Sequence, residues 1–505
     1  MLQKIIYFLV LLSIAILQMY GLHKVGLQEY DSVKNYLIIK QIANGDFGNM
    51  FQHGSPTFFL LFASIYKIYP SALLLAYTNV GINVLAVAIF GHIFSKYFHY
   101  TFWQHCLYVL FAGTSLYVCY GTRSLAIESL SLLVFAISLY YFLEQKTKMM
   151  YYFWACIAIL LTINYKILLF FPLIAIYEIH KIWKEQSFAT AYQMYLRYAI
   201  ILVIPFFFYI LVGILFGVSW KSYPAHWFFV LIMRKNLNPW KNIQTIHWDI
   251  DYYFQYLQNF ESPILLLGIA IFIILQAYFY AKKEMQQKKV SNILLVITVF
   301  TWIEMSILPK APRGILFILP LCYFFAFDAC LQIFQILQTK LQDKIYKNTM
   351  QLFSMSLYVL LIFYQYVQIQ KYIYTYNYTN YPNLVAYLKQ NQIDKIAVTV
   401  GINLQYFLPP SIDFQTILFE KDLEILQKQG YQYCLVDAYY KVVGADVLDV
   451  LQKKTTIISY EEGTLLSPLL YLEHCEFTGY TFEQALATQA QVKQNGRQLK
   501  LIKIQ

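Results

Sequence analysis

Residues 198–217, YAIILVIPFFFYILVGILFG, contain no charged side chain over twenty positions. An α-helix needs about 20 such residues to cross the roughly 30 Å of hydrocarbon in a bilayer. The sequence therefore predicts a membrane span here, and similar runs recur along the chain. Eleven segments qualify, at 5–22, 72–95, 102–120, 124–143, 150–163, 166–180, 198–217, 263–281, 291–308, 314–335 and 351–369.

Composition supports a multi-pass membrane protein. Of 505 residues, 59% are hydrophobic and 13% are charged, whereas soluble domains carry about 25% charged residues. The formal net charge of +11 arises before residue 379, from Lys and Arg scattered between apolar runs. That distribution is typical of a membrane topology signal and argues against a nucleic-acid partner.

Basic residues in short loops predict the orientation. The loops assigned to the cytoplasm hold Lys96, Lys146, Lys148, Lys181, Lys184, Lys282, Lys283, Lys288, Lys289, Lys340, Lys344 and Lys347. The short loops on the opposite side hold only Arg123, Lys166, Lys310 and Arg313. We therefore expect an integral plasma (inner) membrane protein with its N-terminus inside and its C-terminus outside.

Two regions of the predicted bundle are less regular. The apolar stretch 57–69 is too short to span and is expected to lie in the membrane interface. Segments 150–163 and 166–180 are separated only by Asn164-Tyr165-Lys166, so one long re-entrant helix is an alternative there.

The chain changes character near Tyr381-Pro382, which divides it into a transmembrane domain, 1–370, and an outward-facing tail, 379–505. Short apolar runs alternate with helical patterns in the tail, which predicts a small extracytoplasmic α/β domain. Expected helices are 384–390, 422–429 and 446–453, and expected strands are 395–400, 431–437 and 455–460. Cys434 and Cys475 are either a disulfide or two buried thiols.

Charges beside apolar helices are costly and mark candidate sites. The run Glu29-Tyr30-Asp31-Ser32 follows the first span, and a carboxylate there could act as a general base. Arg123 and Glu128 flank the start of the fourth span. The structural alternatives are a solvated loop acid and a simple ion pair.

A second group of charges suits an anion. Lys310-Ala311-Pro312-Arg313-Gly314 sets two cations on a constrained turn after Glu304, and such cations can neutralise a phosphate. Lys166 lies on the same predicted side. Snorkelling toward lipid headgroups is the structural alternative. The outward histidines His53, His226 and His247 are not spaced for a metal.

The order of these features resembles the glycosyltransferases of the C superfamily, in particular the branch of protein O-mannosyltransferases and aminoarabinose–lipid A transferases. The motifs that carry the resemblance are Asp31-Ser32 with Tyr36 and Gly45, His53-Gly54-Ser55-Pro56, Gly121-Thr122-Arg123 with Glu128, and Lys310-Ala311-Pro312-Arg313-Gly314 with Pro320. Two positions depart from the family pattern, because Ser32 stands where a second acidic residue is frequent and Gly314 where an aromatic residue is common.

The resemblance implies a membrane enzyme that moves a hexosyl or pentosyl unit from a polyprenyl-phosphate carrier to a lipid, glycan or protein acceptor, with inversion. It implies Asp31 and Glu128 as catalytic residues. The residues expected to bind substrate are Lys310, Arg313, Arg123, Lys166, His53 and Glu304. No cofactor is required, and participation of a divalent cation stays open because Ser32 removes the second carboxylate.

Two other classes of function remain as alternatives. A transporter or flippase usually places ionisable groups near the membrane midplane and shows repeated halves, whereas here the charges gather at one predicted face. A non-catalytic scaffold that displays the tail is the other alternative.

Overall fold

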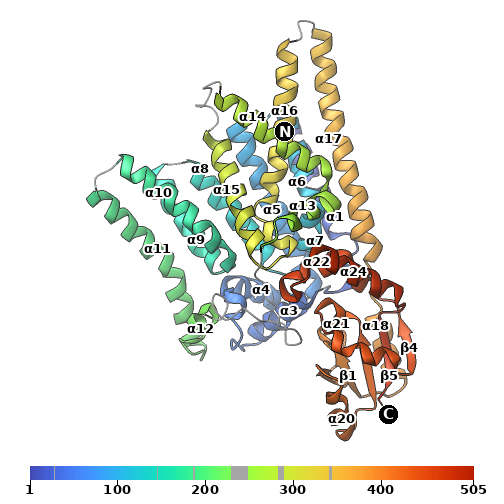
Figure 1. Ribbon diagram of the computed structural model, residues 1–505. Coiled ribbons are helices and arrows are strands. Elements are labelled where there is room, and N and C mark those ends of the chain that lie inside the picture. Colours follow the sequence, from blue (N-terminus) through green and yellow to red (C-terminus); the bar gives the residue numbers. More distant parts are fainter. Residues whose placement is uncertain are drawn as a thin grey trace.

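The computed structural model describes residues 1–27, 29–144, 146–185, 188–228, 248–281, 289–340 and 344–504. A bundle of helices forms most of the molecule, and an α/β tail unit closes one end of it (Figure 1). The N-terminus lies toward the other end of the bundle (Figure 1). The bundle helices are α1 (Leu2–Met19), α2 (Leu22–Val25), α3 (Tyr30–Ala43), α4 (Pro56–Ile68), α5 (Ala72–Phe98), α6 (Phe102–Gly113), α7 (Leu116–Arg123), α8 (Glu128–Glu144), α9 (Thr147–Leu161), α10 (Phe171–Glu185), α11 (Phe188–Leu215), α12 (Ser222–Phe228), α13 (Asp251–Tyr256), α14 (Pro263–Ala281), α15 (Lys289–Ile307), α16 (Leu319–Lys340) and α17 (Lys344–Tyr372).

The helical, membrane-spanning character predicted from the sequence is confirmed. Within the described residues, six helices are long and apolar enough to cross a bilayer. They are Leu2–Val25, Ala72–Phe98, Tyr192–Leu215, Pro263–Ala281, Val290–Ile307 and Leu319–Leu337. The count of eleven spans and their orientation stay predictions.

The predicted span 102–120 is broken into α6 and α7 at Thr114 and Ser115. A buried carboxylate, Glu261, accounts for the break. Its oxygens accept hydrogen bonds from the backbone N–H groups of Leu116 (2.9 Å) and Tyr117 (2.8 Å). They also accept from the hydroxyl of Tyr323 at 2.6 Å. Helix N-terminal N–H groups need such acceptors, so Glu261 supports a new helix start inside the bundle.

Segment 147–185 forms two helices and not one continuous helix. The α9 helix ends at Leu161, a 3₁₀ turn covers Tyr165–Phe170, and α10 begins at Phe171. The side-chain oxygen of Asn164 accepts from the backbone N–H of Lys166 at 3.0 Å and so caps the turn. The short apolar stretch 57–69 is helical as α4, which packs against α3 in a separate hydrophobic cluster.

The tail unit contains one five-stranded sheet with the order β2-β1-β3-β5-β4. Strand β1 pairs in parallel with β2 and β3, whereas β5 is antiparallel to β3 and β4. Its elements are α18 (Tyr381–Gln390), β1 (Lys395–Thr399), α19 (Ile402–Gln405), β2 (Asp413–Ile417), α20 (Lys421–Lys428), β3 (Tyr433–Asp437), α21 (Tyr439–Val442), β4 (Thr456–Tyr460), α22 (Pro468–Glu473), α23 (Cys475–Thr478), α24 (Phe482–Gln494) and β5 (Leu499–Lys503).

Sequence patterns identified three strands of this sheet but not β2 or β5. Strand β2 reads DFQTI and lies largely exposed at the edge of the sheet, so it lacks an apolar alternation. The helix expected at 446–453 is present as a 3₁₀ helix. Cys434 and Cys475 are two buried free thiols, so the disulfide alternative was wrong.

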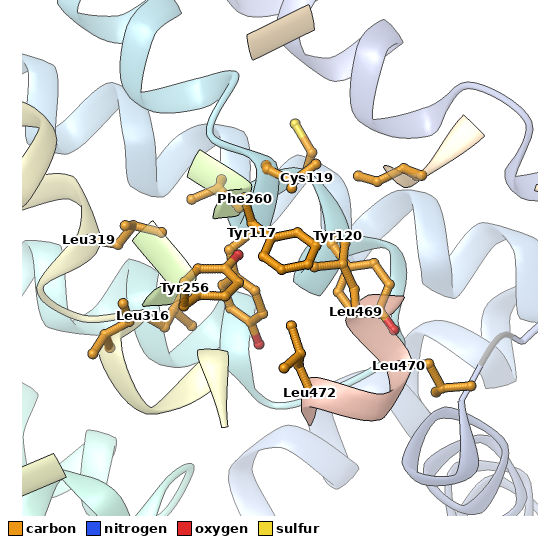
Figure 2. Close-up of a cluster of buried hydrophobic side chains, with 14 of the residues drawn as sticks. Tyr117, Cys119, Tyr120, Tyr256, Phe260, Leu316, Leu319, Leu469, Leu470 and Leu472 are labelled. Carbon is orange, nitrogen blue, oxygen red and sulfur yellow. The ribbon is translucent and has the colours of Figure 1, made fainter. Parts of the chain in front are cut away.

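The tail unit is packed into the bundle through α22. Figure 2 shows Leu469, Leu470 and Leu472 beside Tyr117 and Tyr120 of α7, and these side chains are buried in the main hydrophobic cluster of the molecule. The position of α22, and of the residues that follow it, is therefore set by bundle packing.

We expect Glu261→Gln to lower the free energy of unfolding by about 1–3 kcal/mol, because an amide offers one acceptor oxygen to several buried donors. Thermal unfolding of the purified protein measures this effect. Glu424→Gln, at an exposed position of α20, is the matched control, and equal midpoints for the two variants would contradict the capping role.

Candidate active site

A cavity of about 690 Å³ lies where the bundle meets the tail unit. Its walls come from α3, the start of α8, the turn at Lys166, the link before α16, and the tail. The bundle wall is mainly polar and carries Asp31, Lys34, His53, Glu128, Lys166 and Arg313. The tail wall adds His474 and Glu476 beside Val400, Ile402, Phe414, Leu418, Val443 and Phe477.

Arg313 is the centre of the charges in this cavity, with its side chain only 12% exposed. Its Nη1 lies 3.2 Å from Asp31 Oδ2 and 3.9 Å from Glu128 Oε1. On the tail side, its Nε is 3.3 Å from Glu473 Oε2, and its Nη2 is 3.0 Å from Glu476 Oε1. A guanidinium presents its donors in a fixed fork, which suits contacts in several directions.

The link before α16 brings Arg313 into this position. Ala311 is extended, and Pro312 begins a 3₁₀ turn over Pro312–Ile315. Gly314 packs against the side chain of Tyr253, whose hydroxyl occupies the place that a Cβ would need. Gly314 is therefore a packing requirement of this chain, because a larger residue would displace the buried side chain of Tyr253.

Asp31 lies in the first turn of α3, where the helix dipole favours a carboxylate. Burial alone would raise the pKa of Asp31, but Arg313, His53 and His474 together hold it below its ordinary value. Asp31 is therefore ionised, and in this state its charge is used in the pair with Arg313.

Two neighbouring carboxyls behave in the opposite way. Burial raises the pKa of Glu29 to about 7 and that of Glu473 to about 8, although Arg313 opposes both shifts. The carboxyls around Arg313 outnumber the cations, so burial favours the protonated form of some of them. The site therefore holds exchangeable protons near neutral pH.

Lys166 completes the group of cations. Its Nζ lies 3.3 Å from Glu476 Oε2, so a tail carboxylate contacts both Lys166 and Arg313. His53 also lines the cavity, from a backbone with φ of 56° just before the start of α4.

The structure thus brings together five of the residues expected from the sequence, namely Asp31, Glu128, Lys166, Arg313 and His53. Three others lie elsewhere. The buried Lys310 donates to the carbonyl of Leu308 at 2.6 Å, and burial lowers its pKa to about 8. Neither Lys310 nor Glu304 of α15 lines the cavity.

Arg123 also lies outside the cavity, where it is buried. Its Nη1 donates to the carbonyls of Gln18 (3.0 Å) and Tyr20 (2.8 Å), and its Nη2 donates to Asn377 at 2.7 Å. These bonds tie the end of α1 to the segment that leads into the tail. Such contacts explain a buried cation without any ligand.

Sequence reasoning missed the contribution of the tail. Glu473, His474 and Glu476 stand in one run, Glu-His-Cys-Glu, of which only the cysteine was considered. All four neighbouring positions carry titratable side chains, and this run was the signal in the sequence for a candidate site.

Two solved structures resemble the whole chain. No protein-family model and no curated protein matches the sequence. ArnT from Cupriavidus metallidurans bound to undecaprenyl phosphate superposes with a TM-score of 0.55, over 99% of this chain and 98% of that chain, at 10% identity. The apo state of the same protein gives a TM-score of 0.57 at 11% identity, with the same coverage. This chain has the fold of ArnT.

The likeness to ArnT covers the bundle and the tail together, so both parts belong to one architecture. The resemblance to the C superfamily of glycosyltransferases, and to its aminoarabinose–lipid A transferase branch, is confirmed at the level of the fold. Identity of 10–11% carries no residue-level information, so the roles of individual side chains rest on the geometry of this chain.

A divalent cation needs several oxygen or nitrogen ligands that converge on one point. Among the residues that the structure describes, no group of three or more His, Cys, Asp or Glu side chains is arranged to hold one. The carboxylates at Arg313 are instead directed at a guanidinium and an ammonium group.

The raised pKa of Glu473 predicts a dependence of stability on pH. Its ordinary value is 4.5 and its folded value about 8, so between these values the folded state holds more protons than the unfolded state. Stability from this group is complete below pH 4.5 and is lost as pH rises through 8. Glu473→Gln cannot titrate, so its thermal midpoint should fall less steeply than that of the wild type between pH 5 and 8. Parallel curves for the two proteins would show that Glu473 is not protonated in the fold.

Proposed function

We propose that this chain is a membrane glycosyltransferase that transfers a hexosyl or pentosyl unit from a polyprenyl phosphate to an acceptor hydroxyl, with inversion. The observation that carries the proposal is the meeting of Asp31 with Arg313 and Lys166 in one cavity beside apolar helices. The bound undecaprenyl phosphate of ArnT, which shares the fold, supports a polyprenyl-phosphate donor. The active site and the tail would face the extracytoplasmic side of the plasma membrane.

Arg313 and Lys166 are assigned to the donor phosphate. As the bond between the anomeric carbon and the phosphate oxygen breaks, its electron pair stays on that oxygen and negative charge grows there. Fixed cations stabilise charge that develops in the transition state more than the charge of the ground state. A guanidinium can contact two phosphate oxygens at once, which also orients the group.

Asp31 is assigned as the general base. The acceptor oxygen attacks the anomeric carbon from the face opposite the phosphate, and its proton passes to the Asp31 carboxylate. The products are the glycosylated acceptor and the polyprenyl phosphate. Glu128, at the start of α8, is assigned to orient a substrate hydroxyl, because it lies at the margin of the Arg313 cluster.

The pair of Asp31 with Arg313 suggests how binding of the donor is coupled to activation of the general base. A phosphate that binds Nη1 competes with the Asp31 carboxylate, which lies 3.2 Å away. Displacement of Asp31 removes its counter-charge and so raises its proton affinity. The base would therefore become effective only when the donor is in place.

The site also bears on the alternative functions. Its charges gather at the end of the bundle where the tail unit sits, and tail side chains form part of its wall. A transporter would need them at mid-bundle, and a scaffold would not need buried, mutually paired charges. Both features favour the transferase.

Asp31→Asn should reduce transfer by roughly 10²–10⁴-fold, the usual contribution of a general base. Release of labelled sugar from a polyprenyl-phosphate carrier in membrane extracts measures it. Asp46→Asn is the control, because Asp46 is an exposed acid in the same part of the chain. Wild-type rates for Asp31→Asn would remove Asp31 from the base role.

Arg313→Gln should raise the KM for the donor by about 10–100-fold, since a charge-assisted hydrogen bond contributes about 1.5–3 kcal/mol. Loss of the guanidinium leaves several carboxylates unpaired, so Arg313→Lys serves as a second variant that keeps the charge but lacks the fork. Arg497→Gln, on the tail surface, is the control. An unchanged donor KM in folded Arg313→Lys and Arg313→Gln would contradict the phosphate assignment.

A further inference from the structure

One tail carboxylate contacts both cations assigned to the phosphate. Glu476 Oε1 lies 3.0 Å from Arg313 Nη2, and Glu476 Oε2 lies 3.3 Å from Lys166 Nζ. The Glu476 side chain is only 10% exposed. Arg313 lies in the link before α16, and Lys166 lies in the turn between α9 and α10. Glu476 of the tail therefore joins two parts of the bundle.

The segment that carries Glu476 is rigidly held. It follows α22, whose leucines are buried among bundle side chains (Figure 2). Glu473 contacts the Nε of the same Arg313 at 3.3 Å. Position 476 is therefore fixed from the bundle side by packing and by the contact of Glu473 with Arg313.

A chain of hydrogen bonds fixes the same segment to α3. The ring of His474 contacts the Leu470 carbonyl through Nδ1 at 2.9 Å, which makes Nδ1 the donor and Nε2 an acceptor. The hydroxyl of Tyr439 donates to Nε2 at 2.8 Å and accepts from the backbone N–H of Tyr30 at 3.3 Å. Tyr30 immediately precedes Asp31, so the tail segment contacts both the cations and the helix that bears the base.

For the binding of a phosphate alone, Glu476 is a disadvantage at this place. A carboxylate beside two cations lowers the positive potential that attracts a phosphate, and it occupies one donor of each cation. Two cations without a carboxylate between them would instead repel each other in a site shielded from water. The benefit of Glu476 is thus geometric, because it holds both cations at one spacing.

We propose that Glu476 is a positioning residue, which holds Arg313 and Lys166 together so that one phosphate group is contacted by both. The inference rests on the proposed function. On this basis the tail unit is a working part of the active site, because it supplies the residue that sets the geometry of the phosphate-binding pair.

The proposal predicts a separation of kcat from KM. Glu476→Gln releases a donor on each cation, so ground-state binding of the donor is kept or tightened. Mispositioned cations stabilise the charge on the leaving oxygen less well. The transition state therefore loses more binding free energy than the ground state. We expect kcat per folded enzyme to fall at least about tenfold, with a donor KM unchanged or lowered. Arg313→Gln removes the guanidinium itself, so the donor KM should rise, and this rise separates the two variants.

Matched variants sharpen the test. Glu476→Asp keeps the charge on a shorter stem that cannot reach both cations, so kcat should again fall. Glu424→Gln, at an exposed site in the tail, should behave as the wild type. If Glu476 acts through Lys166, the double variant Lys166→Gln/Glu476→Gln should be no slower than Lys166→Gln alone, because coupled residues are not additive.

Each other outcome overturns the inference. Wild-type kcat and KM in Glu476→Gln would show that the bridge is unused. A raised KM with unchanged kcat would make Glu476 a substrate ligand. Loss of folded protein with unchanged kcat per folded molecule would make it purely structural. If the wild type itself transfers no sugar from any polyprenyl phosphate tested, the proposed function fails. The three outcomes above differ from this one, because in each of them the wild type is active and only the role of Glu476 is wrong.

Discussion

The ion cluster around Arg313 is the constraint on which the rest of the molecule depends. A guanidinium with 12% exposure needs its charge compensated nearby. Its carboxylate partners come from α3, from the start of α8 and from the tail. The cluster can form only when these three parts are docked. It therefore links the position of α3 to that of the bundle and the tail.

An excess of acid is the second property of this cluster. Besides Asp31, the carboxyls of Glu29, Glu128, Glu473 and Glu476 lie close to Arg313, and its pKa is raised by them against the effect of burial. Burial is the main cause of the raised pKa values of Glu29 and Glu473, and neighbouring acids raise both further against the effect of Arg313. An incoming phosphate adds further negative charge, so protons on these two carboxyls offer a way to accommodate it without moving the backbone.

Sequence reasoning found the bundle half of the site because charges beside apolar runs are rare and therefore informative. The end of such a run is the position of Asp31, Glu128, Lys166 and Arg313.

The same rule selected Lys310, Glu304 and Arg123, which do not line the cavity. Local geometry makes the difference in the link before α16, where the extended Ala311 and the turn after it direct Arg313 and Lys310 to different surroundings. That difference depends on backbone angles, which charge patterns do not contain. The helix break at Thr114 and Ser115 was missed for a related reason, because Glu261, which accepts from the new helix start, is 145 residues away in the chain.

The tail half of the site was beyond the same reasoning, for a physical reason. In an α/β unit with ordinary polarity, Glu473 and Glu476 look like solvated surface acids, although they closely follow the apolar run 469–472. They become buried because the leucines of α22 pack beside Tyr117 and Tyr120 of α7 (Figure 2), and Tyr252 of α13 donates to the carbonyl of Leu472. The leucines of α22 thus do two things at once, since the burial that docks the tail also carries two carboxylates to Arg313. A tail that served only for display would gain nothing from placing charges at this buried junction, where their desolvation opposes docking. On the proposed function, their presence argues that the bundle and the tail form one catalytic unit that shares the phosphate-binding geometry.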